Sequence, residues 1–184
     1  ILMHPDYTSV YENDIALIKL ATPLTFDPDS NKVAPICPPS TTDLYETVHA
    51  IVTGWGTLSH GGLTSATLQE VVVPTMSNRK CRSKYGSQIK DNMICAGYTK
   101  GGKDSCQVDS GGPLITADGS YYRQIGVVSW GYGCAMPRYP GVYARVNSNL
   151  DWITTSISGT SWCEPNTTPG VVTPEPTAEP SDCS

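Results

Sequence analysis

Short strand-like runs separated by turn residues constrain the fold of this chain more than any other feature. Apolar and β-branched residues gather at 48–54, 68–73, 93–96, 112–115, 122–130 and 141–146. Turn residues separate these runs, and no helical repeat lies between them. Many short strands without intervening helices are typical of a barrel or a sandwich, so the sequence predicts an all-β fold.

The two ends of the chain differ from this central part. A loop followed by a single strand is expected up to residue 20, with the strand at 14–20, and residues 25–42 read as a Pro-rich linker. One helix is expected late, from apolar residues spaced four, three and four apart: Val146, Leu150, Ile153 and Ile157. From Gly159 onward Pro, Thr, Glu and Ser dominate, so we expect a domain at 1–158 and a disordered tail at 159–184.

Composition excludes several classes of partner. Apolar residues make up 39% of the chain, and with 17 glycines this is the usual share for a globular protein that buries a core. The formal net charge is -5 and only 16% of residues are charged, so no basic stripe suits a nucleic acid. No apolar run approaches the roughly 18 residues of a membrane span, so no membrane partner is expected.

The cysteines indicate an oxidising compartment. There are seven: Cys37, Cys81, Cys95, Cys106, Cys134, Cys163 and Cys183. They lack the paired CxxC spacing with histidines that is typical of a zinc site, so disulfides are the better interpretation and secretion is expected. An odd count leaves one sulfur unpaired, which indicates a bonding partner on another chain or on a part of the protein outside this sequence.

The strongest local motif surrounds a serine. It reads Asp104-Ser-Cys-Gln-Val-Asp-Ser-Gly-Gly-Pro-Leu114. Taken alone, its Gly-Gly-Pro part could be a turn between strands. Four further motifs accompany it in order: Asn13-Asp-Ile-Ala-Leu17, Thr53-Gly-Trp-Gly56, Ser129-Trp-Gly-Tyr-Gly-Cys134 and Pro140-Gly-Val-Tyr143. Together they resemble the trypsin-like (chymotrypsin-fold) serine proteases from about residue 2 to about residue 157.

This resemblance implies a two-barrel fold, of which the chain holds the last part of the first barrel, the whole second barrel and a C-terminal helix. The family's Ala-Ala-His-Cys motif, which carries the catalytic base, is absent. None of the three histidines stands in a matching motif: His4 lies in a His-Pro turn, His49 precedes a strand, and His60 lies in a Gly-rich loop. The resemblance therefore implies the C-terminal two-thirds of a protease domain, and we expect this chain alone to be inactive.

The resemblance also assigns catalytic roles by position. Ser110 matches the nucleophile, and Asp14 matches the acid that orients the catalytic histidine. Asp109 matches the acid that pairs with a new N-terminal amine after zymogen cleavage. The backbone amides of Val108 and Ser110 match the oxyanion hole. No cofactor and no metal are implied.

A substrate pocket is implied by the same comparison. Its residues are Asp104, Ser105, Ser129, Trp130, Gly131 and Gly141. Asp104 matches the floor, Gly131 and Gly141 match the walls, and residues 129–131 match the segment that pairs with the substrate backbone. A buried carboxylate favours Lys or Arg in the substrate, because a cation relieves its desolvation. An exposed acid beside Lys103 is the alternative for Asp104.

Two departures from the family bear on the site. Val108 stands where the family has Gly, and a β-branched residue resists positive φ, so its amide is expected to point away from the oxyanion and to weaken activity. Ala50 and Thr116 occupy positions where many relatives carry two bonded cysteines. Loss of both members together is consistent with one dropped bridge.

The family pattern sorts the remaining cysteines. It implies the bridges Cys81–Cys95 and Cys106–Cys134, and it matches Cys37 to a linker cysteine that relatives often bond to an upstream part of the same protein. Cys163 and Cys183 lie beyond the family's usual end, where they could close a loop on themselves.

We therefore expect a secreted serine endopeptidase that cleaves proteins or peptides after Lys or Arg in the complete protein. The alternative is a protease homologue that has lost its chemistry and retains the fold to bind partners.

Overall fold

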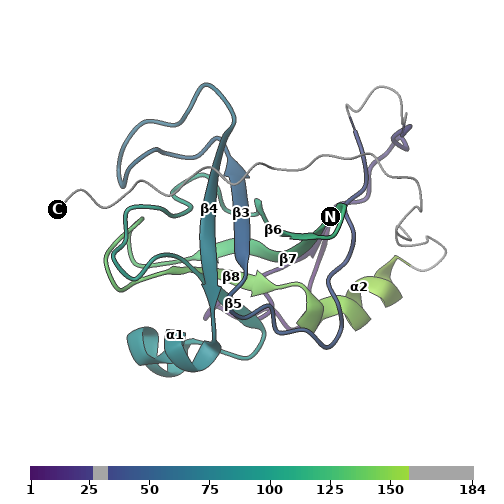
Figure 1. Cartoon of the computed structure of the whole chain (residues 1–184). Coiled ribbons are helices and arrows are strands. Elements are labelled where there is room, and N and C mark those ends of the chain that lie inside the picture. Colours follow the sequence, from purple (N-terminus) through teal and green to yellow (C-terminus); the bar gives the residue numbers. More distant parts are fainter. Residues whose placement is uncertain (27–32, 158–184) are drawn as a thin grey trace.

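A closed antiparallel barrel dominates the part of the chain that the computed structural model describes, residues 1–26 and 33–157 (Figure 1). Its strand order is β3-β4-β5-β8-β7-β6. The strands are β3 (His49–Gly54), β4 (Gln69–Met76), β5 (Met93–Ala96), β6 (Pro113–Asp118), β7 (Tyr121–Trp130) and β8 (Gly141–Arg145). The expected all-β fold with a C-terminal helix is confirmed. The tail expected at 159–184 lies outside the described residues.

Alternating side chains of these strands fill the barrel. On β3, Ala50 and Val52 are buried while their neighbours are less so, which is the period-two pattern of a sheet with one buried face. The inner cluster also draws on the other strands: Val73, Ile94, Leu114, Ile125, Val128 and Tyr143. The apolar runs therefore close around this inner cluster, and a second cluster of Met76, Met93, Cys95 and Val142 packs with Cys81 and Tyr85.

Two strands extend beyond their expected ends. The sequence places a strand at 68–73, but β4 continues through Pro74 to Met76, because Thr75 and Met76 pair with β5. Pro74 lacks an amide hydrogen, and its carbonyl accepts a 2.9 Å hydrogen bond from Gly97. The run expected to end at residue 115 continues as β6 to Asp118, where it forms a hairpin with β7.

A helix that the sequence does not predict follows β4. It is α1 (Asn78–Tyr85), at the lower edge of the barrel in Figure 1. Only Cys81 and Tyr85 are buried, so the segment has no apolar stripe from which a helix could be recognised. Local chemistry sets its ends: the Ser77 side chain accepts a hydrogen bond from the amide of Lys80, and Gly86 ends the helix at φ 63°.

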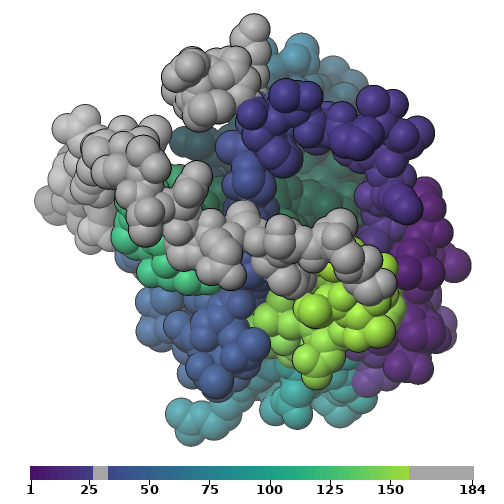
Figure 2. Space-filling view, turned by 90° about the vertical axis from the view of Figure 1, so that its right-hand side faces the viewer, coloured from purple at the N-terminus to yellow at the C-terminus, as the bar shows by residue number. Residues whose placement is uncertain are grey.

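The helix expected at 146–157 forms in two parts. A short 3-10 turn, η2 (Asn147–Asn149), precedes α2 (Leu150–Ser156). The expected stripe is buried as Val146, Leu150 and Ile153, and it packs against Ile15 and Leu17 near the N-terminus. Figure 2 shows α2, in yellow-green, beside the purple N-terminal segment.

The N-terminal region differs from the expected single strand at 14–20. Only Ala16–Leu17 (β2) is extended, and it pairs with Leu2–Met3 (β1), which the sequence places in a loop. The sequence could not predict β1 or the short length of β2, because a strand of two residues shows no alternation of apolar and polar side chains. Beyond β2, Ile18 is 70% exposed, so much apolar surface in this region is uncovered.

The described cysteines form two disulfides. Cys81–Cys95 joins α1 to β5, and Cys106–Cys134 joins the loop before β6 to the loop after β7. Cys37 is buried and forms no disulfide, and its backbone forms an isolated β-bridge with Arg123 of β7. Cys163 and Cys183 lie outside the described residues.

Ala50 of β3 and Thr116 of β6 are cross-strand partners. The two positions at which the family often carries a bridge therefore face each other. None of the helices within residues 1–26 and 33–157 has the length and apolar character of a membrane span.

Candidate active site

Asp14 lies just before β2 and is tied to the barrel by side-chain contacts. The hydroxyl of Ser129, on β7, donates a 2.6 Å hydrogen bond to Oδ2 of Asp14. The preceding residue, Asn13, has a positive φ of 52°, and its Oδ1 accepts a 2.8 Å hydrogen bond from Nδ2 of Asn92. These contacts fix the carboxylate relative to β7 although it belongs to a loop.

Ser110 lies on a tight turn that leads into β6. The amide of Gly111, at φ 84°, donates to the carbonyl of Val128, and the amide of Gly112 donates to the carbonyl of Asp109. The amide of Val128 returns a 2.9 Å hydrogen bond to Gly112, so the turn is bound to the β7 residue next to Ser129. Ser110 is exposed, and its hydroxyl makes no hydrogen bond within the described part of the chain. One short stretch of β7 thus holds both the Ser110 turn and Asp14.

The expectation that Val108 avoids positive φ is wrong. Its φ is 74°, the left-handed region that favours glycine, and its side chain is 70% exposed. Over the described residues, neither the amide of Val108 nor that of Ser110 donates a hydrogen bond to another protein atom. Surrounding contacts, including the 3.1 Å hydrogen bond from the Asp109 amide to the Cys106 carbonyl, outweigh the stiffness of the valine.

The side chain of Asp109 points toward the Gly54 and Gly56 segment. Its two carboxylate oxygens accept hydrogen bonds from the amides of Gly56, at 2.8 Å, and Cys106, at 3.0 Å. A Cβ at position 54 or 56 would collide with this carboxylate, so the Thr-Gly-Trp-Gly motif leaves the space that Asp109 fills. Among the described residues the carboxylate has backbone donors and no cationic partner.

Asp104 lies in a partly buried position between two loops. It accepts hydrogen bonds from the amides of Ser105, at 2.9 Å, and Ala135, at 3.0 Å. Burial raises the pKa of Asp104 to about 6, since desolvation penalises its charged form more than the two backbone donors stabilise it. A carboxylate with this environment is stabilised by a cation brought to it.

The residues expected to form the pocket walls lie beside this carboxylate. A Cβ on Gly141 would approach Oδ1 of Asp104 to 2.6 Å, so only glycine leaves the carboxylate in place. A Cβ on Gly131 would lie 3.8 Å from the Cα of Gly141, which places the two glycines side by side. The hydroxyl of Ser105 lies 3.2 Å from that of Tyr143. The structure therefore brings these sequence-predicted residues together.

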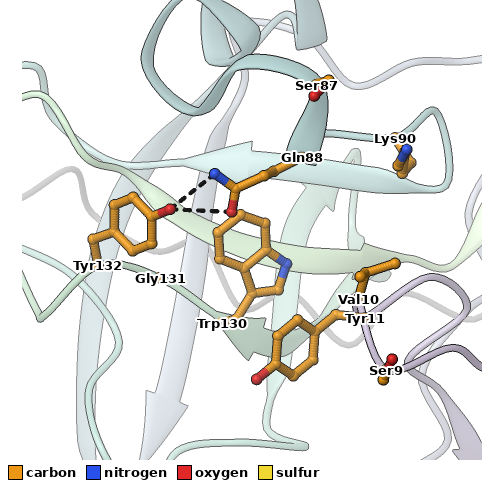
Figure 3. A pocket seen from close by; sticks show the side chains of 9 residues that line it. All are labelled: Ser9, Val10, Tyr11, Ser87, Gln88, Lys90, Trp130, Gly131 and Tyr132. Carbon is orange, nitrogen blue, oxygen red and sulfur yellow. Dashed lines mark hydrogen bonds between the residues drawn. The ribbon is translucent and has the colours of Figure 1, made fainter.

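A hollow of about 440 Å³ lies along the segment that contains Trp130 and Gly131 (Figure 3). We call it the aromatic trough. It is lined by Ser9, Val10, Tyr11, Ser87, Gln88, Lys90, Trp130, Gly131 and Tyr132. The ring of Tyr11 stacks on that of Trp130 at 6.1 Å between centroids, and Gln88 and Tyr132 share hydrogen bonds of 2.8 and 3.1 Å.

Sequence reasoning missed most of the trough. Tyr132 lies within a recognised motif, but nothing local marks Tyr11 or Gln88, which come from distant loops. The helix α1 was missed as well, although its last residue, Tyr85, packs edge-on against Trp130 at 5.0 Å.

The three histidines have other surroundings. His4 packs against Trp152 of α2 at 4.6 Å, His49 is exposed at the start of β3, and His60 lies near Gly133. None contacts the hydroxyl of Ser110 through a hydrogen bond in the described part. Nor do three His, Cys, Asp or Glu side chains of the described residues converge on a candidate metal site.

A closed six-stranded barrel, a serine on a glycine-rich turn, and a carboxylate bound to the same strand as that turn are features of the chymotrypsin-fold serine endopeptidases. The trypsin family model matches residues 1–153, and the chain belongs to this family. Members of this family include trypsins, which are serine endopeptidases that act on protein substrates.

Three relatives illustrate the similarity. Trypsin-1 of Astacus astacus is 51% identical over 155 residues, which cover 83% of this chain and 64% of the relative. A venom protease of Bombus pensylvanicus is 48% identical over 155 residues, covering 82% and 62%. Anionic trypsin of Bos taurus is 44% identical over 163 residues, covering 88% and 63%. The chain spans less than two-thirds of the length of each.

Proposed function

We propose that this chain is part of a secreted serine endopeptidase that cleaves protein chains after Lys or Arg. Ser110 is the nucleophile, Asp14 orients the histidine that acts as base, and that histidine lies outside the 184 residues. The proposal agrees with the length of the relatives, since the chain covers 64% of trypsin-1 and 62% of the venom protease.

The environment of Asp104 carries the proposed specificity. Its side chain is partly buried, its pKa is raised to about 6, and its only donors among the described residues are two backbone amides. Glycine at 141 leaves room for the Asp104 carboxylate, because a Cβ there would lie 2.6 Å from its Oδ1. A Lys or Arg side chain of the substrate supplies the missing positive charge and gains a charge-assisted hydrogen bond.

The proposed mechanism follows from the positions of these groups. The base takes the proton of the Ser110 hydroxyl as its oxygen attacks the substrate carbonyl, and Asp14, held by Ser129, stabilises the resulting imidazolium. The amides of Val108 and Ser110 have no protein acceptor in the described residues, so both are free to stabilise the oxyanion. The leaving amine receives the proton, and water then hydrolyses the acyl-enzyme.

The remaining parts of the proposal concern context. Two disulfides and relatives named trypsin and venom protease support an extracellular location. Cys37 is free and buried, which suits a thiol that bonds to an upstream part of the same protein. Without the base, the 184-residue chain made alone has no detectable proteolytic activity.

A cleavage profile of the complete, activated protein on a peptide library tests the specificity. Lys and Arg dominate at the cleaved position, and Asp104→Ser lowers kcat/KM for Arg substrates at least about 100-fold, because it leaves a buried cation unpaired. Asp6→Ser, an exposed acid remote in sequence, is the control and changes nothing. A wild-type profile dominated by Phe, Tyr or Leu would contradict the proposed specificity for Lys and Arg.

One observation favours a second function, a non-catalytic homologue that binds partners: Val108, rather than glycine, occupies a strained turn beside the nucleophile. Labelling of the complete protein by a fluorophosphonate separates the two. An enzyme is labelled at Ser110, whereas a binding module with the same fold is not.

A further inference from the structure

Positive charge is concentrated in one stretch of this acidic chain. The formal net charge is -5, yet residues 71–103 hold seven of the twelve Lys and Arg residues and only one of the seventeen Asp and Glu residues. Four of the cations lie within the eight residues of α1. Their side chains, together with that of Lys90, are here called the basic patch: Arg79, Lys80, Arg82, Lys84 and Lys90.

The helix presents this charge to solvent. Cys81 and Tyr85 face the core at 0% and 3% exposure, while Arg79 and Lys80 are exposed. Only Arg82 has a carboxylate partner in the described part, Asp91 at 2.5 Å, and that carboxylate is itself 94% exposed. The first turn holds no acid. The patch therefore carries a surplus of accessible positive charge.

Helix stability accounts for Arg82 and Lys84, which lie in the last turn where cations suit the helix dipole. It does not account for Arg79 and Lys80. Cations in the first turn oppose the helix dipole, and like charges three or four residues apart repel each other. Each such contact costs a few tenths of a kcal/mol in an exposed helix. A role in binding would explain why these cations are present despite that cost. An anionic group bound on the patch would be attracted by each of these charges.

The patch is continuous with the proposed substrate path. Tyr85, at the end of α1, packs edge-on against Trp130 at 5.0 Å, and its hydroxyl donates to the carbonyl of Pro140 at 2.7 Å. The next turn, η1 (Gly86–Gln88), and Lys90 line the aromatic trough opposite Tyr11, as Figure 3 shows. A chain that leaves the trough on this side meets the basic patch next.

We propose that the basic patch is an exosite for an acidic segment of the protein substrate, on the acyl side of the cleaved bond. This rests on the proposed function, since the trough must hold substrate for the segment to reach α1. A membrane surface is less suited, because both apolar residues of α1 point into the core and leave nothing to insert.

Two peptides that differ only in charge test the exosite on the complete protein. Both end in the same cleavable Arg amide, and one carries four Glu residues placed five to eight positions before the Arg, where the other carries Gln. The acidic peptide is expected to show a roughly tenfold lower KM and an unchanged kcat. The difference shrinks to about twofold in 0.5 M salt, where exposed charges are screened.

Charge reversal locates the effect. Arg79→Glu/Lys80→Glu removes the preference, whereas Lys19→Glu/Lys100→Glu, which changes the net charge equally outside α1 and the trough, preserves it. The α1 variant is expected to fold, since acids in the first turn suit the dipole and Lys80→Glu completes a capping box with Ser77. Neither variant alters cleavage of a tripeptide amide that ends before the patch.

The outcomes separate the exosite from the proposed function. Equal KM values for the two peptides, or a preference that survives Arg79→Glu/Lys80→Glu, overturn the exosite while Arg cleavage stands. If the tripeptide amide is not cleaved at all, the proposed function fails, and anisotropy of the labelled acidic peptide still tests binding. Charge-dependent binding of heparin or of anionic vesicles to α1, without binding of the acidic peptide, also overturns it.

Discussion

The hydroxyl of Ser129 holds the carboxylate of Asp14 through a 2.6 Å hydrogen bond that spans 115 residues of sequence. Ser129 directly follows Val128, whose backbone bonds to both glycines of the Ser110 turn. A single β7 segment therefore sets the position of the proposed orienting acid relative to the proposed nucleophile. This coupling makes Ser129 a candidate positioning residue, in addition to its place in the proposed substrate segment.

Replacing Ser129 with Ala is expected to lower kcat of the complete protein roughly tenfold with little change in KM. The carboxylate loses a charge-assisted hydrogen bond, while the backbone proposed to pair with substrate is unaltered. Steady-state kinetics on an Arg peptide measure the split. Ser129→Thr retains a hydroxyl and is expected to recover most of kcat; equal losses in both variants would assign the effect to packing.

Val108→Gly is expected to raise the free energy of unfolding by about 1 kcal/mol, because glycine adopts a φ of 74° without a Cβ penalty. Because the valine already occupies this conformation, kcat should stay within about twofold. Urea denaturation and kinetics provide the measurements. Val108→Ala removes the exposed isopropyl group but retains Cβ, so a similar gain in both variants would contradict relief of backbone strain.

The free energy of unfolding of Asp104→Asn, relative to that of wild type, is expected to increase as pH rises. The pKa of Asp104 is about 6 in the folded chain against 3.8 for the free side chain, so the folded state binds the proton more tightly. Wild-type stability therefore falls between these pH values, by about 2 kcal/mol after allowance for partial exposure.

Denaturation between pH 4 and pH 7.5, in a Ser110→Ala background that prevents self-cleavage, measures this difference. The stability of Asp104→Asn relative to wild type should grow as pH rises through 6 and then level off. At every pH the variant loses about 1 kcal/mol, because the amide cannot keep both backbone hydrogen bonds. Asp6→Asn, at an exposed position, is the control. A difference that is constant with pH would show that Asp104 carries no burial penalty.

Gly141→Ala is expected to destabilise the protein by about 2 kcal/mol and to impair cleavage after Arg, since the new Cβ would approach Asp104 to 2.6 Å and Tyr143 to 3.1 Å. Gly131→Ala, whose Cβ would have its nearest neighbour at 3.8 Å, should leave stability within about 0.5 kcal/mol. Thermal unfolding of the two variants gives the comparison. Equal loss in both would mean that Asp104 moves freely.

Local sequence was sufficient for much of the barrel. The runs that become β3, β5, β7 and β8 were placed within a residue or two, because alternation and turn residues act over a few positions. The serine motif was recognised through its resemblance to a known family, and the backbone of its turn depends on Gly111 and Gly112 themselves. Helix α1 was not, because its burial consists of two side chains, Cys81 and Tyr85.

By itself, then, the sequence determined the strand pattern, the serine turn and the residues available for chemistry. Only the tertiary structure decided how they meet: Asp14 with Ser129, Tyr11 with Trp130, and Asp104 beside Gly141. It also decided that Val108 takes positive φ against its own preference. The physical reason is common to all four. These features depend on contacts between residues far apart in sequence, which no local pattern in the chain indicates. The burial that raises a pKa or outweighs backbone strain depends on the same contacts.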